Sequence, residues 1–246
     1  MTRPLTVAAL YDIHGNAPAL EAVIAEVPDD AAIVIGGDTA VGFAPVRTLE
    51  LLDALGDRAH WIRGNADRPH TLESDIWVER ENWTVAQIGD DRAAWLASLP
   101  ETLTLDVDGL GATLFCHGSP RSDEESLTRV TSEERFAEIL ADVEATTIVC
   151  GHTHQQFDRR ARGKRIVNAG SVGLPYEGRP GAYWTLLGPD VEHRRSDYDF
   201  AAAAAALRSS GFPAPEELTD WLFDDPPDPD EVAEFFERRA LETARS

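Results

Sequence analysis

The stretch Thr6-Val-Ala-Ala-Leu-Tyr-Asp-Ile-His-Gly-Asn16 decides the fold, because an apolar run ends directly in an Asp-x-His pair. The run is too short for a helix and its residues suit a buried strand. Residues two apart in extended backbone face the same side, so Asp12 and His14 can face one cation. A carboxylate beside an imidazole suits a borderline divalent metal. The alternative is that Asp12 only enters the following helix and His14 is incidental.

Strand and helix patterns alternate after this stretch. Apolar residues at helical spacing predict helices over 17–27 and 45–55, and short apolar runs predict strands over 32–35 and 60–63. This βαβαβ opening predicts a largely parallel sheet. Later segments predict a hairpin over 102–116, a helix over 132–143, and strands over 147–150, 155–159, 165–168 and 182–187, with antiparallel pairing favoured. We therefore predict an α/β (α+β) fold, a four-layer αββα sandwich of two mixed sheets flanked by helices.

Two regions depart from this alternation. Residues 67–100 carry three tryptophans and many charges, and we expect a helical insertion that roofs the site. We assign residues 1–199 to the main domain and residues 200–246 to an acidic, helical C-terminal appendage packed on it. The alternative for the appendage is a subunit contact through Phe235 and Phe236, and hence a homo-oligomer.

The composition excludes several kinds of partner. The formal net charge is −22, and Lys164 is the single lysine among 22 basic residues. Such a surface repels long nucleic acid and anionic membranes. The two cysteines, Cys116 and Cys150, rule out a disulfide framework and are expected to be buried and reduced. We expect a cytoplasmic protein, because no signal-like segment or long apolar run is present.

Polar motifs follow five of the predicted strands. Taken alone, each could be an ordinary turn or a structural histidine. In open α/β sheets, however, ligands gather beyond the carboxyl ends of strands. The five motifs are Asp12-Ile-His14, Gly36-Gly-Asp38, Gly64-Asn65-Ala66-Asp67-Arg68, Cys116-His117-Gly118 and Gly151-His152-Thr-His154.

This ordered set resembles the signature of the calcineurin-like metallophosphoesterase superfamily, over about residues 7–173. Asn65-Ala66-Asp67 and Asn168-Ala-Gly-Ser-Val-Gly173 resemble the small prokaryotic phosphodiesterase branch. The resemblance implies that one metal is held by Asp12, His14, Asp38 and His154. It implies that a second metal is held by Asp38, Asn65, His117 and His152, with Asp38 bridging through its two oxygens.

The resemblance also implies the chemistry. Two divalent ions (Mn, Fe, Zn, Ni or Co, with manganese expected in vitro) would hydrolyse a small phosphate ester or nucleotide, most simply a phosphodiester, with a metal-bridging hydroxide. Arg68 is a candidate phosphate contact. Many relatives carry a histidine at the position of Ala66 that is thought to protonate the leaving group, and Asp67 or His70 are the candidate substitutes. The alternatives are a phosphomonoesterase or protein phosphatase on this fold, or a catalytically silent metal-binding scaffold.

Overall fold

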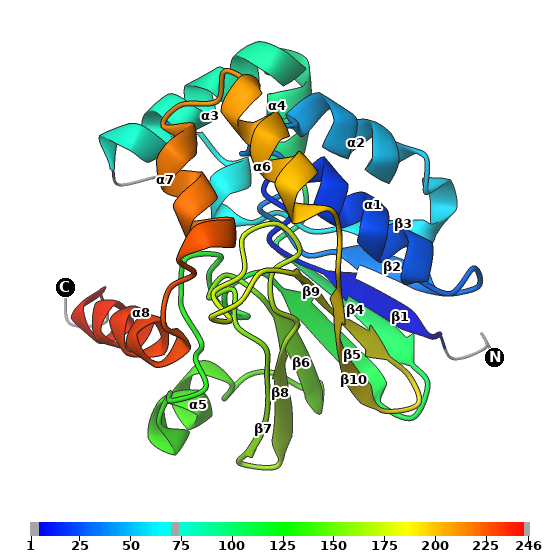
Figure 1. Cartoon of the computed structure of the whole chain (residues 1–246). Helices are drawn as coiled ribbons and strands as arrows, with labels where there is room; N and C mark the ends of the chain where they lie inside the picture. The colour runs from blue at the N-terminus through cyan, green and yellow to red at the C-terminus, as the bar shows by residue number, and fades with distance from the viewer. Residues whose placement is uncertain (1–4, 70–73, 244–246) are drawn as a thin grey trace.

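Two five-stranded sheets form the centre of the molecule. The computed structural model describes residues 5–69 and 74–243 (Figure 1). The first sheet has the strand order β10-β9-β1-β2-β3 and the second the order β4-β5-β6-β8-β7. The strands are β1 Val7–Leu10, β2 Ala32–Ile35, β3 Ala59–Trp61, β4 Thr102–Val107, β5 Gly111–Cys116, β6 Thr147–Cys150, β7 Phe157–Ala161, β8 Lys164–Asn168, β9 Ala182–Leu187 and β10 Val191–Ser196.

Both sheets are mixed, as predicted. In the first sheet β1, β2 and β3 run parallel, while β9 pairs antiparallel with β1 and with β10. In the second sheet β5, β6 and β8 run parallel and the two edge strands are antiparallel. The expectation that the later strands pair antiparallel is therefore wrong for β5, β6 and β8. The long connection between β5 and β6 carries a helix, which is the kind of crossover that parallel pairing needs.

Apolar side chains fill three layers around and between the sheets. Tyr11 and Val34 of the first sheet pack against Phe115 and Val149 of the second. On the outer face of the first sheet, Leu20 belongs to the cluster that buries α1 (Ala17–Glu26) and α2 (Pro45–Asp53). On the outer face of the second sheet, α5 (Glu133–Ile139) buries its own apolar residues. The predicted four-layer αββα sandwich is confirmed.

Helices from the insertion and the tail gather at one end of the molecule (Figure 1). The insertion contains α3 (Asp75–Ile88) and α4 (Asp90–Ala97), and the tail contains α6 (Phe200–Ser209), α7 (Pro215–Thr219), a π-helical turn (Asp220–Asp224) and α8 (Pro229–Thr243). Trp83 of α3 meets Phe212 edge to face, at 5.3 Å between ring centroids. Arg80 of α3 donates to the carbonyl oxygens of Pro213 and Ala214. Insertion and tail therefore stabilise each other.

Helix α8 lies apart from the other tail helices, beside α5 (Figure 1). Its Phe235 is 49% exposed, whereas Phe236 is half-buried, so the two phenylalanines do not form one outward-facing patch. Cys116 and Cys150 are buried and unpaired, as expected. Among the described residues, no helix combines the length and apolar character needed to cross a membrane.

Candidate metal centre

The predicted ligands lie where strands of both sheets end. Asp12 and His14 follow β1, Asp38 follows β2, His117 follows β5, and His152 and His154 follow β6. The backbone of Gly151 donates to the carbonyl oxygen of His117, which holds the two loops of the second sheet together. The carboxyl ends of the parallel strands therefore meet at one place, as in other open α/β sheets.

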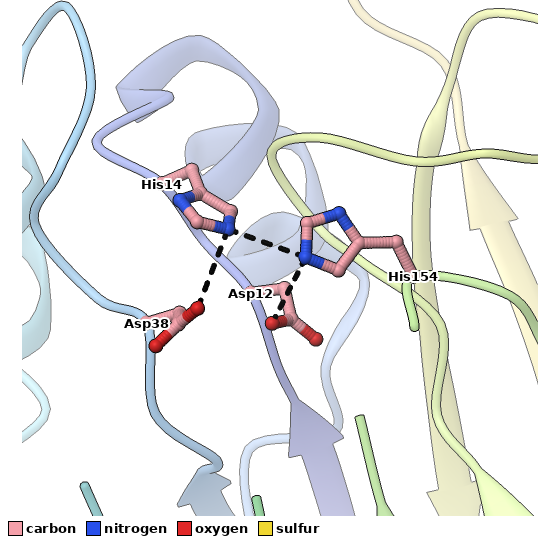
Figure 2. Close-up of side chains that lie close together, drawn as sticks. All are labelled: Asp12, His14, Asp38 and His154. Carbon is pink, nitrogen blue, oxygen red and sulfur yellow. Dashed lines mark hydrogen bonds and ion pairs between the residues drawn. The ribbon is translucent and has the colours of Figure 1, made fainter. Parts of the chain in front are cut away.

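Four of these side chains form a compact group. Asp12, His14, Asp38 and His154 each offer one ligand atom, and these atoms lie within 4.8 Å of one another. Figure 2 shows the four side chains pointing toward a common centre. The Nε2 atoms of His14 and His154 are 3.3 Å apart, and the Nε2 of His154 is 3.2 Å from Oδ1 of Asp12. The Nε2 of His14 is 3.7 Å from Oδ2 of Asp38.

Backbone carbonyls fix which nitrogen of each ring carries the proton. The Nδ1 atoms of His14 and His154 lie 3.3 Å from the carbonyl oxygen of Val41 and 2.5 Å from that of Leu174. Each Nδ1 therefore donates, which leaves the lone pair of each Nε2 to face the site. Two lone pairs 3.3 Å apart cannot hydrogen-bond to each other. A shared cation would satisfy both, so this donor set fits a metal.

A second group lies on the other side of Asp38. The Nε2 of His117 is 3.5 Å from Oδ2 of Asp38 and 3.2 Å from Oδ1 of Asn65. Its Nδ1 lies 2.8 Å from the carbonyl oxygen of Gly36, so again Nε2 faces the site. The ring of His152 meets the ring of His117 edge to face, at 5.2 Å between centroids. The structure thus brings all seven predicted ligands into two adjoining groups.

The two aspartates divide their oxygen atoms between backbone and site. Oδ1 of Asp38 accepts the backbone N–H of Ala66 at 2.7 Å, which leaves Oδ2 between His14 and His117. Oδ2 of Asp12 accepts the backbone N–H of His152, and its buried Oδ1 has no hydrogen-bond partner within residues 5–69 and 74–243. A buried carboxylate oxygen without a donor is costly unless a cation neutralises it. This atom also fits a metal ligand.

The backbone is strained at the same residues. Five of the seven predicted ligands have positive φ angles between 45° and 65°: Asp12, His14, Asp38, His152 and His154. Each such residue costs on the order of 1–3 kcal/mol, and such strain clusters at functional sites. The backbone of Gly64 also lies very close to the side chain of Asp38, because a Cβ at Gly64 would be 2.2 Å from Oδ1 of Asp38. The loops are therefore shaped around the site at a cost in stability.

Burial and neighbouring charges shift the pKa values of the ligands strongly. Burial, with help from His154, lowers the pKa of His14 to about 4, and burial with His117 does the same for His152. Burial also opposes charge on His117, but the carboxylates of Asp38 and Asp12 outweigh it and raise that pKa to about 10. Neutral histidines are the form that binds metal. Such large opposite shifts within one cluster are typical of functional sites.

The two predicted catalytic residues already have protein partners. Both oxygens of Asp67 accept backbone N–H groups, from Asp38 at 2.8 Å, Gly64 at 2.9 Å and Thr39 at 3.0 Å. The guanidinium of Arg68 makes a two-pronged contact with Asp123, at 2.8 and 2.7 Å. Roles for Asp67 and Arg68 toward substrate remain predictions, as does one for His70, which lies outside the described residues.

Residues that hold the ligand loops escaped the sequence analysis. Asn168 donates from Nδ2 to the carbonyl oxygen of Gly151 at 2.7 Å, and the hydroxyl of Ser171 donates to the carbonyl oxygen of Asp12 at 2.8 Å. Residues 168–173 entered the sequence analysis only as part of the family resemblance, without a role in the site. The ring of Tyr176 stacks on His154, with ring centroids 4.8 Å apart and planes 17° apart. No local motif signals that contact.

The C-terminal helix also reaches the site. Phe236 of α8 meets the ring of His152 edge to face, at 5.9 Å between centroids. Trp77 of the insertion lies 6.3 Å from the ring of His14. Both flanks of the ligand cluster are therefore covered by aromatic side chains from segments outside the αββα sandwich.

Comparison with known proteins agrees with this geometry. The family model of the calcineurin-like phosphoesterase superfamily domain matches residues 5–187. A hypothetical protein from Pyrococcus horikoshii OT3 is similar in structure, with a TM-score of 0.77 and 22% identity, covering 89% of this chain and 97% of that one. A metallophosphoesterase from Sphaerobacter thermophilus is similar with a TM-score of 0.72 and 25% identity, covering 89% and 98%. No curated protein matches in sequence. Because the family match spans most of its length, the chain belongs to the calcineurin-like phosphoesterase superfamily.

Proposed function

We propose that this protein is a two-metal phosphodiesterase that hydrolyses a small phosphate ester at the cluster of seven ligands. The observation that carries the proposal is the pair of bare Nε2 atoms of His14 and His154, 3.3 Å apart and beside two buried carboxylates. Protons alone cannot satisfy both Nε2 lone pairs and both carboxylates, whereas divalent cations can bind all of them. The family assignment supports hydrolysis of phosphoester bonds.

The residues divide into two sets that share one aspartate. Asp12, His14, Asp38 and His154 would hold one ion, and Asp38, Asn65, His117 and His152 the other. Asp38 would belong to both sets: its Oδ1 accepts the N–H of Ala66, and its Oδ2 lies between His14 and His117. When bound, two divalent ions lower the pKa of water and neutralise charge on phosphoryl oxygens.

The protein groups around the ions would hold geometry rather than move protons. Asp67 fixes the backbone of Asp38 and Gly64 through charge-assisted hydrogen bonds, so we assign it a positioning role. Arg68 would have to leave Asp123 to contact a phosphoryl group. Ala66 offers no proton, and the leaving alcohol must therefore depart without help from that position.

The test is hydrolysis of bis(p-nitrophenyl) phosphate with added manganese, together with elemental analysis of the dialysed protein. We expect two metal ions per chain and a higher kcat/KM for this diester than for p-nitrophenyl phosphate. Asp38→Asn should abolish hydrolysis and reduce metal content, because Asp38 serves both sets. Asp30→Asn, at an exposed position, is the matched control and should change neither.

The alternatives predict different results. A protein that binds two metals but hydrolyses no ester would be a silent scaffold. Faster turnover of p-nitrophenyl phosphate than of the diester would make it a monoesterase. Full activity in the metal-free protein would refute the proposal.

A further inference from the structure

A large cavity lies between the helical insertion and the loops that carry the ligands. We call it the insertion pocket; its lining includes Ala66, Thr84, Val85, Ile88, Ala93 and Leu96. Its volume is about 520 Å³, within the range of sites that hold small molecules. Most of the lining side chains are small or apolar, so the pocket suits an apolar group.

The insertion pocket shares its wall with the metal centre. Ala66 follows the ligand Asn65 directly, and its backbone N–H donates to Asp38. Val41, which also lines the pocket, accepts from the ring of His14 through its carbonyl oxygen. The pocket therefore borders the metal centre through residues that hold its ligands in place.

The charged side chains of the lining indicate the chemistry of the occupant. Thr84 lines the pocket, but it is 1% exposed and its Oγ1 is enclosed by protein, so its hydroxyl does not face the cavity. The lining includes three carboxyl groups, of Asp67, Glu81 and Asp90, against the one guanidinium of Arg68. The pocket therefore disfavours an anionic group.

We propose that the insertion pocket receives the leaving alcohol of the substrate, as an uncharged aromatic group. This rests on the proposed function, because the phosphoryl group must be held at the metal centre. The proposal also accounts for the small side chain of Ala66, because a larger residue at this position would narrow the pocket. An aromatic alcohol leaves more easily without a proton than an alkyl alcohol does.

The first experiment measures binding without catalysis. 2-Naphthol is titrated into the metal-free full-length protein, and its fluorescence reports saturation. Ala93→Phe places a ring in the pocket from half-buried α4 and should weaken binding at least tenfold. Ala86→Phe adds the same ring on the exposed face of α3, outside the lining, and should leave affinity within twofold.

The second experiment compares methyl 2-naphthyl phosphate with methyl phenyl phosphate. We expect the naphthyl ester to have the higher kcat/KM in the wild type, and the ratio to fall at least tenfold in Ala93→Phe only. Absence of saturable 2-naphthol binding, or equal affinity in the wild type and in Ala93→Phe, would overturn the pocket assignment. Saturable, Ala93-dependent binding in a protein that hydrolyses no ester would instead keep the pocket and refute the phosphodiesterase.

Discussion

Glu237 anchors α8 on the body of the protein, and we predict that Glu237→Ala detaches the helix. The hydroxyls of Thr128 and Thr131 donate to Oε2 of Glu237 at 2.9 and 2.6 Å, and Arg135 donates to Oε1 at 3.2 Å. The side chains of Arg135 and Glu237 are only 9% and 15% exposed. Solvent therefore screens this group of contacts weakly.

The expected loss follows from these contacts. A hydrogen bond to a charged group contributes about 1.5–3 kcal/mol, and Glu237 accepts three of them. Without Glu237, one of the hydroxyls of Thr128 and Thr131 can donate to the other, since their Oγ1 atoms lie 3.1 Å apart, and this returns part of the loss. A net loss of about 3 kcal/mol would raise the ratio of detached to docked helix more than about a hundredfold. Phe236 would then leave His152.

Hydrogen–deuterium exchange over residues 229–243 measures this directly, and protease cleavage within the acidic, proline-rich link 225–228 gives a second reading. Glu234→Ala is the matched control on the same helix. Glu234 is 70% exposed and pairs with Arg238 at 3.9 Å, a contact worth about 0–1 kcal/mol. Wild-type protection of α8 in Glu237→Ala, or equal loss of protection in both variants, would refute the anchoring role.

Two further predictions concern catalysis and pH. Because Ala66 supplies no proton, bis(p-nitrophenyl) phosphate should be hydrolysed much faster than a dialkyl phosphate at saturating manganese, and comparable kcat values for the two esters would contradict this. Burial alone would raise the pKa of Glu125, but hydrogen bonds from Arg121 and Ser119 outweigh burial and lower it. A carboxyl group whose pKa is lower in the folded protein stabilises the fold at pH values above its pKa in the unfolded chain, which is about 4.3. This contribution is lost as the pH falls through the pKa of the group in the folded protein. Glu125→Gln should therefore lower the free energy of unfolding in urea at pH 7, and the difference from wild type should shrink below about pH 4; a difference that is constant with pH would argue against it.

Local sequence rules were enough for much of the fold. The apolar run before Asp12 had to be a strand, and helix α1 begins where Asn16 caps it by accepting from the backbone N–H of Ala19. Such rules act over a few residues, through periodicity and turn chemistry. They failed for β5, β6 and β8, because the direction of pairing depends on how connecting segments cross the sheet.

The candidate site divides in the same way. The sequence by itself determined the residue types and their order: an aspartate, histidine or asparagine directly after each of five strands, which is the chemistry that divalent metals need. The family resemblance added that Ala66 stands where many relatives carry a histidine.

Tertiary structure alone decided which atoms meet. His14 and His154 are 140 residues apart, and their Nε2 atoms face each other only because two separate sheets pack with their strand ends together. Other tertiary contacts commit both oxygens of Asp67 to the backbone, place Phe236 against His152, and leave the insertion pocket open beside Ala66. Contacts over such distances depend on the burial of whole helices and sheets, which no local pattern encodes.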